Sequence, residues 1–209
     1  MIETLISDLL SRDPLVRVRA APALGDLGAA AIKAIPALLS LTQDETQHPL
    51  IRVLAAAAVA KIDPAQTGAV IPVLISALNS DDAPLQGAAA DEQAVLGKHA
   101  EPALPALFAL LGDNCAAVRS TAAQAICRIT GNRMPAEQVG RSLLRSEDWL
   151  DRQVGGGLLV LLGANRQLIA HLLPTADRSL FVASDRQTTA SISGQGLRTR
   201  FLRDLGQYS

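Results

Sequence analysis

The chain has 209 residues and a formal net charge of −1; 49% of its residues are hydrophobic, but only 2% are aromatic. This length suffices for one large domain with a substantial core, and a core poor in aromatic side chains favours close packing of helices over stacked sheets. The nearly neutral charge does not favour binding to a nucleic-acid backbone, and the apolar runs are too short to span a bilayer. Because the N-terminus also lacks the basic segment of a secretion signal, we expect a cytoplasmic protein without a membrane partner.

The first clear helix signal is the sequence DPLVRVRAAPALGDLG at residues 13–28. Asp13 can cap a helix that starts at Pro14, because an aspartate accepts from free amides of the first turn and proline lacks an amide that would need a partner. Similar polar segments, NSDDAP at 79–84 and GDN at 112–114, precede the corresponding helices further along. We expect each of these segments to cap a helix.

The pattern around Arg17 returns four times. We call its place the marker position; its occupants are 33–35 residues apart and are Arg17, Arg52, Gln86, Arg119 and Arg152. A fixed period of this length is typical of a solenoid. Paired small residues follow each marker by three and four positions, as Ala20-Ala21, Ala55-Ala56, Ala89-Ala90, Ala122-Ala123 and Gly155-Gly156. Small side chains let neighbouring helices approach closely, so this face is predicted to contact other helices.

Another apolar segment precedes the marker helix in the middle repeats, at residues 34–41, 70–78 and 103–111. Pro36, Pro72 and Pro105 stand at matching places in these segments, and we expect them in the first turn of a helix. Each repeat is therefore a helical hairpin. The sequence predicts an all-α fold, a right-handed α-solenoid of about five hairpins over residues 1–172, followed by a non-repeat segment over 173–209.

The marker position is predicted to be structural. Asp13, Asp82 and Asp148 stand four residues before a marker residue, so an acid and the marker can meet on one helical turn. Such a pair contributes only about 0.3–0.5 kcal/mol when exposed.

The residues two, five and nine positions after each marker should lie opposite the packed face of the second helix. With their neighbours they give a candidate groove of mixed charge, suited to a protein or peptide. The candidate partner-binding residues are Arg19, Asp26, Lys61, Asp91, Glu92, Thr121, Gln124 and Arg128. Gln93 stands where the other repeats have an apolar residue, which indicates either a functional site or a local shift of helix register.

The last repeat and the tail differ from the rest. Both faces of VGGGLLVLLG at 154–163 are apolar, so the groove side of the fifth repeat should be covered. The covering element is predicted in the segment 197–208, whose apolar residues are spaced by four. In this interpretation Leu197, Phe201 and Leu205 cover Val154, Leu158 and Leu161. A partner-docking element and the edge of a longer protein are the alternatives for this tail.

The segment DPLVRVRAAPALGDLG, followed by AIPALLSL, resembles a HEAT repeat, in particular the short HEAT-like repeats of bacterial bilin lyase subunits and of bacterial scaffold proteins. The resemblance covers about residues 1–172 and implies a HEAT-like α-solenoid. Gln86 and Asp151 depart from the pattern, so the ladder of aspartate and arginine could be interrupted at the third repeat and repacked at the fifth. HEAT repeats serve unrelated partners, so the repeat type does not select one function.

The leading functional hypothesis is a non-catalytic scaffold that binds a protein or peptide along the groove. The resemblance also implies an enzymatic alternative, a bilin lyase-like or phycobiliprotein-associated role. A HEAT-like DNA glycosylase is a third hypothesis, but it requires a basic, aromatic-lined groove, and the only tryptophan, Trp149, stands beside acidic residues.

The chain carries few residues that suit catalysis or metal binding. Some HEAT proteins are di-iron hydroxylases built on His-Glu pairs, but none of His48, His99 and His171 is followed by glutamate. Cys115 and Cys127 are predicted to be reduced, buried thiols, since two cysteines make no disulfide framework or zinc motif. We therefore predict no cofactor and no metal.

Overall fold

Six consecutive pairs of helices build residues 1–183, the part of the chain that the computed structural model describes. The first helices of the pairs are α1 (Ile2–Leu9), α3 (Ile35–Gln43), α5 (Thr67–Leu78), α7 (Leu104–Ala109), α9 (Met134–Leu143) and α11 (Arg166–Leu172). The second helices are α2 (Pro14–Asp26), α4 (Pro49–Ile62), α6 (Ala83–Leu96), α8 (Ala116–Thr130), α10 (Trp149–Leu161) and α12 (Thr175–Ala183). The short 3₁₀ helices are η1 (Gly28–Ala34), η2 (Pro64–Gln66), η3 (Gly97–Ala103) and η4 (Leu110–Gly112). The predicted all-α solenoid is confirmed.

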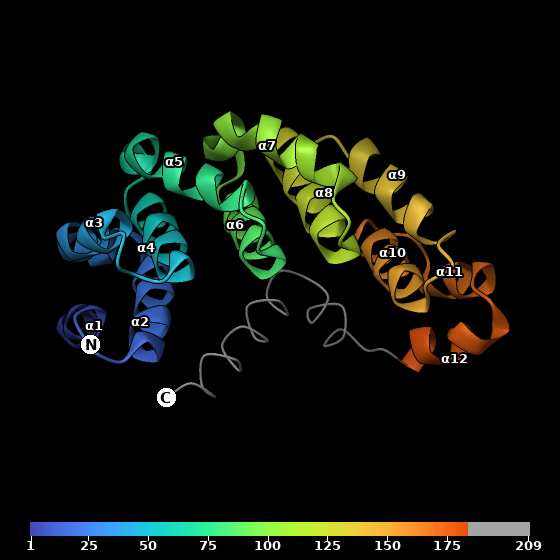
Figure 1. The fold of residues 1–209 in the computed structure, drawn as a ribbon, viewed down its shortest axis with the longest axis horizontal. Helices are drawn as coiled ribbons and strands as arrows, with labels where there is room; N and C mark the ends of the chain where they lie inside the picture. The colour runs from blue at the N-terminus through green and yellow to red at the C-terminus, as the bar shows by residue number, and fades with distance from the viewer. Residues whose placement is uncertain (184–209) are drawn as a thin grey trace.

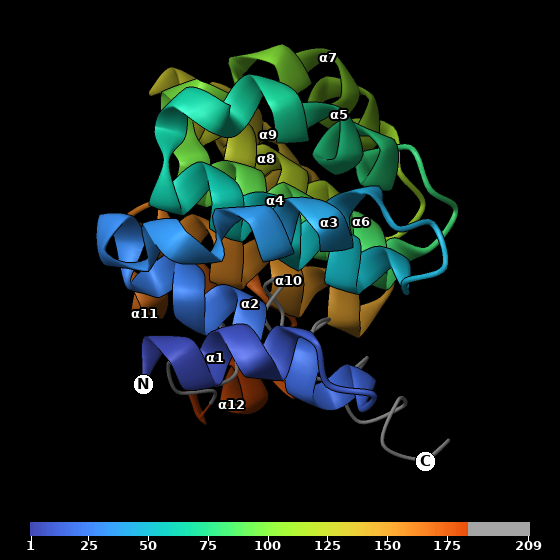
Figure 2. The same cartoon turned by 90° about the vertical axis from the view of Figure 1, so that its left-hand side faces the viewer.

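The pairs are arranged in an arc with two layers (Figure 1). The second helices α2, α4, α6, α8 and α10 follow the inner side of the arc, and the first helices α1, α3, α5, α7 and α9 follow the outer side. Seen from the N-terminal end, the later pairs lie behind the first ones (Figure 2). We call these two sets the inner and the outer helices.

Most of the inner helices are preceded by a residue whose side chain caps the first turn. The Oδ1 atoms of Asp13 and Asp148 accept from the backbone amide two residues later, at 2.8 and 2.7 Å, and Asp82 accepts from the amide three residues later, at 3.3 Å. Each bond satisfies one of the free amides of a first helical turn. The predicted caps of α2 and α6 are thus confirmed.

The predicted cap in GDN is displaced. The residue that precedes α8 is Cys115, whose side chain makes no capping bond. Asp113 instead accepts from the amide of Cys115 at 2.7 Å, in the turn before the helix.

Two of the three matching prolines occupy the first turn of a helix, as predicted: Pro36 in α3 and Pro105 in α7. The prediction is wrong for Pro72, which lies inside α5. The reason is the length of the preceding 3₁₀ helix, because η2 has three residues whereas η1 and η3 have seven. α5 therefore begins at Thr67, well before the proline.

The paired small residues lie in the contacts between helices. All ten of them are buried. At Gly155 in α10, a Cβ atom would stand 2.6 Å from Cβ of Leu143 and 2.7 Å from the carbonyl oxygen of Gly140, both in α9. The predicted close approach of neighbouring helices is confirmed, and at α9 and α10 it requires glycine.

The fifth repeat is covered by the chain's own helices. Val154 packs with Ala116 and Leu143, and Leu158 packs with residues of α8 and α9, so both are buried within the solenoid. Leu161 is 56% exposed. The prediction that all three need an added cover is therefore wrong. Leu197, Phe201 and Leu205, the predicted cover, lie outside the described residues.

The pair α11–α12 packs against α10 after the fifth repeat. Phe181 of α12 is 1% exposed and lies in a cluster with Leu159, Ile169 and Leu173. At Gly156 of α10, a Cβ atom would stand 2.6 Å from Cε2 of Phe181. α12 thus supplies an aromatic ring that fills the end of the solenoid.

Candidate functional site

The marker side chains hold the turn that precedes their own helix. The guanidinium of Arg17 donates to the carbonyl of Ser11, and Nε of Arg52 donates to the carbonyl of Thr42 at 3.1 Å. Arg119 and Arg152 each donate through NH1 to two successive turn carbonyls, at 2.7–3.0 Å. Gln86 keeps a longer bond of 3.4 Å to the carbonyl of Leu78. These bonds satisfy carbonyls at the end of an outer helix or in the turn, so the marker position is structural.

The predicted pairs of an acid with the marker four residues later do not form. Asp13, Asp82 and Asp148 act as helix caps, which directs their carboxylates to backbone amides. Two markers instead meet an acid of the following helix pair: Arg119 lies 3.6 Å from Asp151, and Nε of Arg152 lies 2.6 Å from Asp177. Asp151, a departure from the repeat pattern, is thus a link between consecutive repeats.

The position nine residues after the marker is exposed in four of the five inner helices. We call the residues at this position the inner row: Asp26, Lys61, Val95, Arg128 and Leu161. Asp26 and Arg128 are exposed, Lys61 is half-buried, and Val95 and Leu161 are 57% and 56% exposed. Three charged and two apolar side chains thus make up this row along the inner side of the arc.

Several candidate groove residues are less accessible than the sequence predicts. Arg19 is exposed, and Asp91 and Gln124 are half-buried. Thr121 is fully buried and donates to the carbonyl of Ala117, and Glu92 is 7% exposed, so the prediction that these two face a partner is wrong. The inner helices lie so close together that positions two residues after the marker fall within helix contacts at every repeat except the first.

Lys61 and Glu92 connect the second and third repeats. Nζ of Lys61 lies 2.8 Å from Oε2 of Glu92, and the two side chains are only 18% and 9% exposed. Gly25 of α2 leaves room for the stem of Lys61, because a Cβ atom there would stand 3.3 Å from Cδ of the lysine. Removal of either partner would break a nearly buried ion pair, so this pair belongs to the framework of the inner surface.

Gln93 lies in the core and not on the surface. It is 0% exposed, and both its amide atoms lack a hydrogen-bond partner among the described residues. The equivalent residues of the other repeats are Leu24, Val59, Ile126 and Leu159. Gln93 thus follows the helical register of the other repeats, which excludes the local register shift.

The turn before α4 carries two groups with shifted pKa values. Burial lowers the pKa of His48 below its usual 6.5, against a smaller opposite effect of the charge of Asp82. Nδ1 of His48 accepts from the amide of Leu50 at 3.1 Å, which requires that nitrogen to be unprotonated. The pKa of Asp44 is lowered mainly by hydrogen bonds from the side chains of Thr46 and Gln47. His48 therefore stabilises the turn in its uncharged form, and Asp44 stabilises it in its charged form.

The residues considered for chemistry lie apart from one another. Cys115 and Cys127 are free and only half-buried, so the prediction that they are buried is wrong. Over residues 1–183 there is no group of three or more histidine, cysteine, aspartate or glutamate side chains that could hold a metal ion. In the same range, no helix is long and apolar enough to cross a membrane.

Two family models agree with the repeat architecture. The family model for HEAT repeats matches residues 2–94, and a second model, for a single HEAT repeat, matches residues 103–132. None of the curated proteins matches the chain. Among solved structures, the chain is similar to the complex of CpcE and CpcF of phycocyanin lyase from Nostoc sp. PCC7120, with 22% sequence identity and a TM-score of 0.46. That similarity covers 98% of this chain and 94% of the other.

The matched segments span the helix pairs α1–α2 and α3–α4, continue through α5 and most of α6, and resume at α7–α8. Together with the recurring marker position and the paired small residues, they assign the repeats over most of the described residues. The chain belongs to the HEAT-repeat family.

Proposed function

We propose that the chain is a cytoplasmic, non-catalytic interaction scaffold that holds a partner protein or peptide against its inner row. The supporting observation is the inner row itself, in which four exposed side chains, two charged and two apolar, stand at the same position of their helices, together with the half-buried Lys61. A solenoid presents such a row on a rigid framework, because each repeat is fixed by its neighbours.

The dimensions suit a peptide-sized contact. Neighbouring packed helices are separated by about 8–10 Å, so four steps from Asp26 to Leu161 span roughly 35 Å. An extended chain rises about 3.3 Å per residue, so roughly ten residues of a partner would follow the whole row. The mixture of negative, positive and apolar side chains in the row favours a mixed polar and apolar segment over a uniformly charged polymer.

The test is capture of partners from a lysate of the source organism by the full chain and by a fourfold variant of the inner row. The variant carries the changes Asp26→Lys, Val95→Glu, Arg128→Glu and Leu161→Glu. Lys61 is kept because its change would break the nearly buried ion pair with Glu92 and disturb the fold. We expect the wild-type chain to capture a specific protein and the variant to lose it at an unchanged melting temperature.

A matched variant with changes in the first helices of four pairs, α1, α7, α9 and α11, is the control. It carries four changes of the same kinds at exposed positions: Glu3→Lys, Phe108→Glu, Arg141→Glu and Leu168→Glu. Capture should survive these changes. Loss of the partner in the control, or its retention in the inner-row variant, would refute the assignment to the inner row.

The bilin-lyase alternative has its own test. A bilin mixed with the purified chain, with or without an apo-phycobiliprotein, should show no shift of its visible absorption band if the chain is a non-catalytic scaffold. A shifted band that depends on the chain would favour the alternative.

A further inference from the structure

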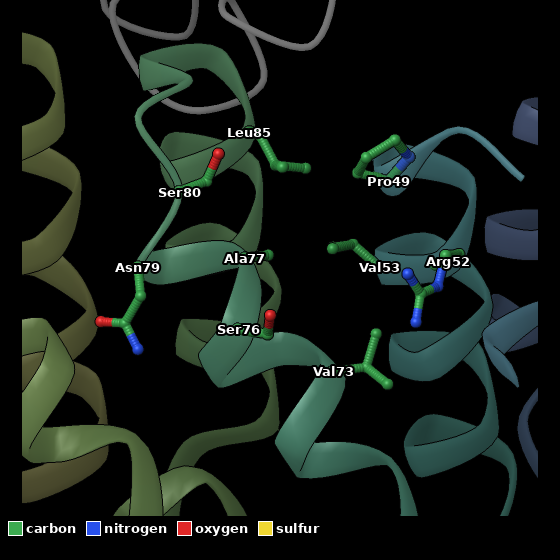
Figure 3. Close-up of a pocket in the computed structure, with 9 residues that line it drawn as sticks. All are labelled: Pro49, Arg52, Val53, Val73, Ser76, Ala77, Asn79, Ser80 and Leu85. Carbon is green, nitrogen blue, oxygen red and sulfur yellow. The ribbon is translucent and has the colours of Figure 1, made fainter. Parts of the chain in front are cut away.

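A pocket lies between α4 and the corner that joins α5 to α6, with a volume of about 350 Å³ (Figure 3). Its polar lining includes the side chains of Arg52, Ser76 and Ser80, and apolar walls are formed by Val53, Val73 and Leu85. The pocket faces the start of α6, whereas the inner row lies near the ends of the inner helices. It is thus distinct from the surface proposed above.

Arg52 brings a positive charge to this pocket. Its Nε atom donates to the carbonyl of Thr42, and its terminal amino groups have no hydrogen-bond or ion-pair partner within residues 1–183. Figure 3 shows these amino groups directed toward the space beside Val53 and Val73. A guanidinium held through Nε can still offer a pair of parallel donors to a carboxylate.

The fourth repeat shows which kind of residue can pair with a marker arginine. Arg119, the marker of the fourth repeat, faces Asp151, which stands directly before the marker of the fifth repeat. The equivalent residue for Arg52 is Leu85, directly before Gln86, and Leu85 lines the pocket. At the first repeat, the corresponding residue is Ile51, which is fully buried. Arg52 thus faces an open pocket, and the acidic residue that pairs with Arg119 has no counterpart beside it.

The remaining polar groups also suit an anion. Oγ of Ser80 accepts from the amide of Asp82 at 3.1 Å, which leaves the hydroxyl proton available to a ligand. The carboxylate of Asp82 is engaged as the cap of α6, where Oδ1 accepts from the amide of Leu85. Ser76 is an exposed residue of α5, and its hydroxyl lies across the pocket from Arg52.

We propose that this pocket binds an acidic side chain, glutamate or aspartate, of a peptide or protein partner. The carboxylate pairs with the terminal amino groups of Arg52, as the carboxylate of Asp151 pairs with Arg119. The hydroxyls of Ser76 and Ser80 add donors, and Val53, Val73 and Leu85 cover the aliphatic part of the acidic side chain. This site deepens the proposed scaffold function by naming a chemical feature of its partner.

The test uses defined peptides and the full chain. The probe is the blocked peptide acetyl-Ala-Ala-Glu-Ala-Ala-amide, and its glutamine counterpart is the neutral control. Binding is followed by isothermal titration calorimetry and by chemical-shift changes of the peptide. We expect the glutamate peptide to bind and the glutamine peptide to bind roughly ten- to a hundredfold more weakly, since charge-assisted hydrogen bonds are lost.

Two variants remove the site in different ways. Arg52→Gln removes the charge but keeps an amide that can serve the turn, as Gln86 does in the next repeat. Leu85→Asp places an acid where the fifth repeat has Asp151, so the chain should occupy its own pocket, and Leu85→Asn is its uncharged control. Arg141→Gln changes the same net charge at an exposed outer position.

The proposal predicts that Arg52→Gln and Leu85→Asp lose the glutamate peptide, while Arg141→Gln keeps it and Leu85→Asn retains more binding than Leu85→Asp. It is overturned if the wild-type chain binds no glutamate peptide, if both peptides bind equally, or if Arg52→Gln binds as wild type. Binding of only a peptide with a free C-terminal carboxylate would overturn the acidic-side-chain assignment in favour of a chain terminus. The inner-row variant should still bind the peptide, which separates this site from failure of the inner-row assignment.

Discussion

The contact between α9 and α10 predicts the effect of a single methyl group. In Gly155→Ala, the new Cβ would stand 2.6 Å from Cβ of Leu143, 2.7 Å from the carbonyl oxygen of Gly140 and 3.0 Å from the amide nitrogen of Leu144. All three atoms belong to or adjoin the backbone, so the two helices must separate. Overpacking costs about 1–3 kcal/mol, and rigid neighbours place this site toward the upper end.

Alanine also favours a helix over glycine by about 1 kcal/mol, which opposes the clash. We therefore expect a net loss of about 1–2 kcal/mol in the free energy of unfolding. For a chain of this size, that corresponds to a fall of roughly 2–8 °C in the melting temperature, measured by circular dichroism at 222 nm.

Gly68→Ala is the matched control. Gly68 lies in α5, and a Cβ atom there would meet no atom within 4 Å. This variant should melt at the wild-type temperature or above it. If Gly155→Ala were as stable as Gly68→Ala, the close approach of α9 and α10 would be refuted.

Three further predictions concern the core, the turn before α4 and the end of the solenoid. Gln93→Leu should raise the free energy of unfolding by about 1–3 kcal/mol, because it removes a buried amide without partners; Gln153→Leu, whose amide donates to the carbonyl of Asp177, should give no such gain in the same denaturation experiment. Stability should fall as the pH drops below 6.5, since the pKa of His48 is lower in the folded chain and unfolding then takes up a proton; His48→Asn keeps a capping oxygen and should flatten this part of a pH series, and an unchanged slope would exclude His48 as its source. A chain that ends at Pro174 loses Phe181 and should melt at a markedly lower temperature, and Phe181→Ala should lower the free energy of unfolding by about 3–5 kcal/mol. A chain that ends at Ala183 should melt as the full chain does; a lower melting temperature would instead favour a cover from residues 197–208.

The repeat architecture could be predicted because periodic packing leaves a periodic sequence. Ala20, Ala55 and their counterparts recur at fixed distances from the marker, since every pair of inner helices must approach in the same way. The sequence also indicated a structural role for the marker. It did not indicate the acceptors, because backbone carbonyls of the preceding turn leave no residue signature.

The accessible surface was harder to predict. A helical wheel treats each helix as isolated, so it placed Thr121 opposite the packed face, whereas neighbouring helices cover it. Glu92 was included as a neighbour of Asp91, but it is nearly buried and paired with Lys61. The position nine residues after the marker is exposed in four of the five repeats, but the wheel alone cannot distinguish it from the positions two and five residues after the marker. The exposure of Val95 and Arg128 thus follows from the arrangement of the stacked helices and not from local periodicity.

Contacts between repeats were visible only in part. Asp151 was recognised as a departure from the pattern, but its partner Arg119 lies one repeat earlier, and only the alignment of consecutive markers reveals the match. Asp177 and Phe181 follow the last marker, where no period remains to place them. The pocket at Arg52 is likewise open because Leu85 stands where the fifth repeat has an acidic residue. This difference becomes evident only by comparison with the pair of Arg119 and Asp151.

The central claim, that a partner lies along the inner row, is tested most directly by hydrogen–deuterium exchange of the chain alone and in complex with its captured partner. We predict added protection in the last turns of α2, α6, α8 and α10, around Asp26, Val95, Arg128 and Leu161, with no change in α1, α3, α7 and α9. Protection confined to the outer helices, or a complex without added protection in the inner helices, would contradict it.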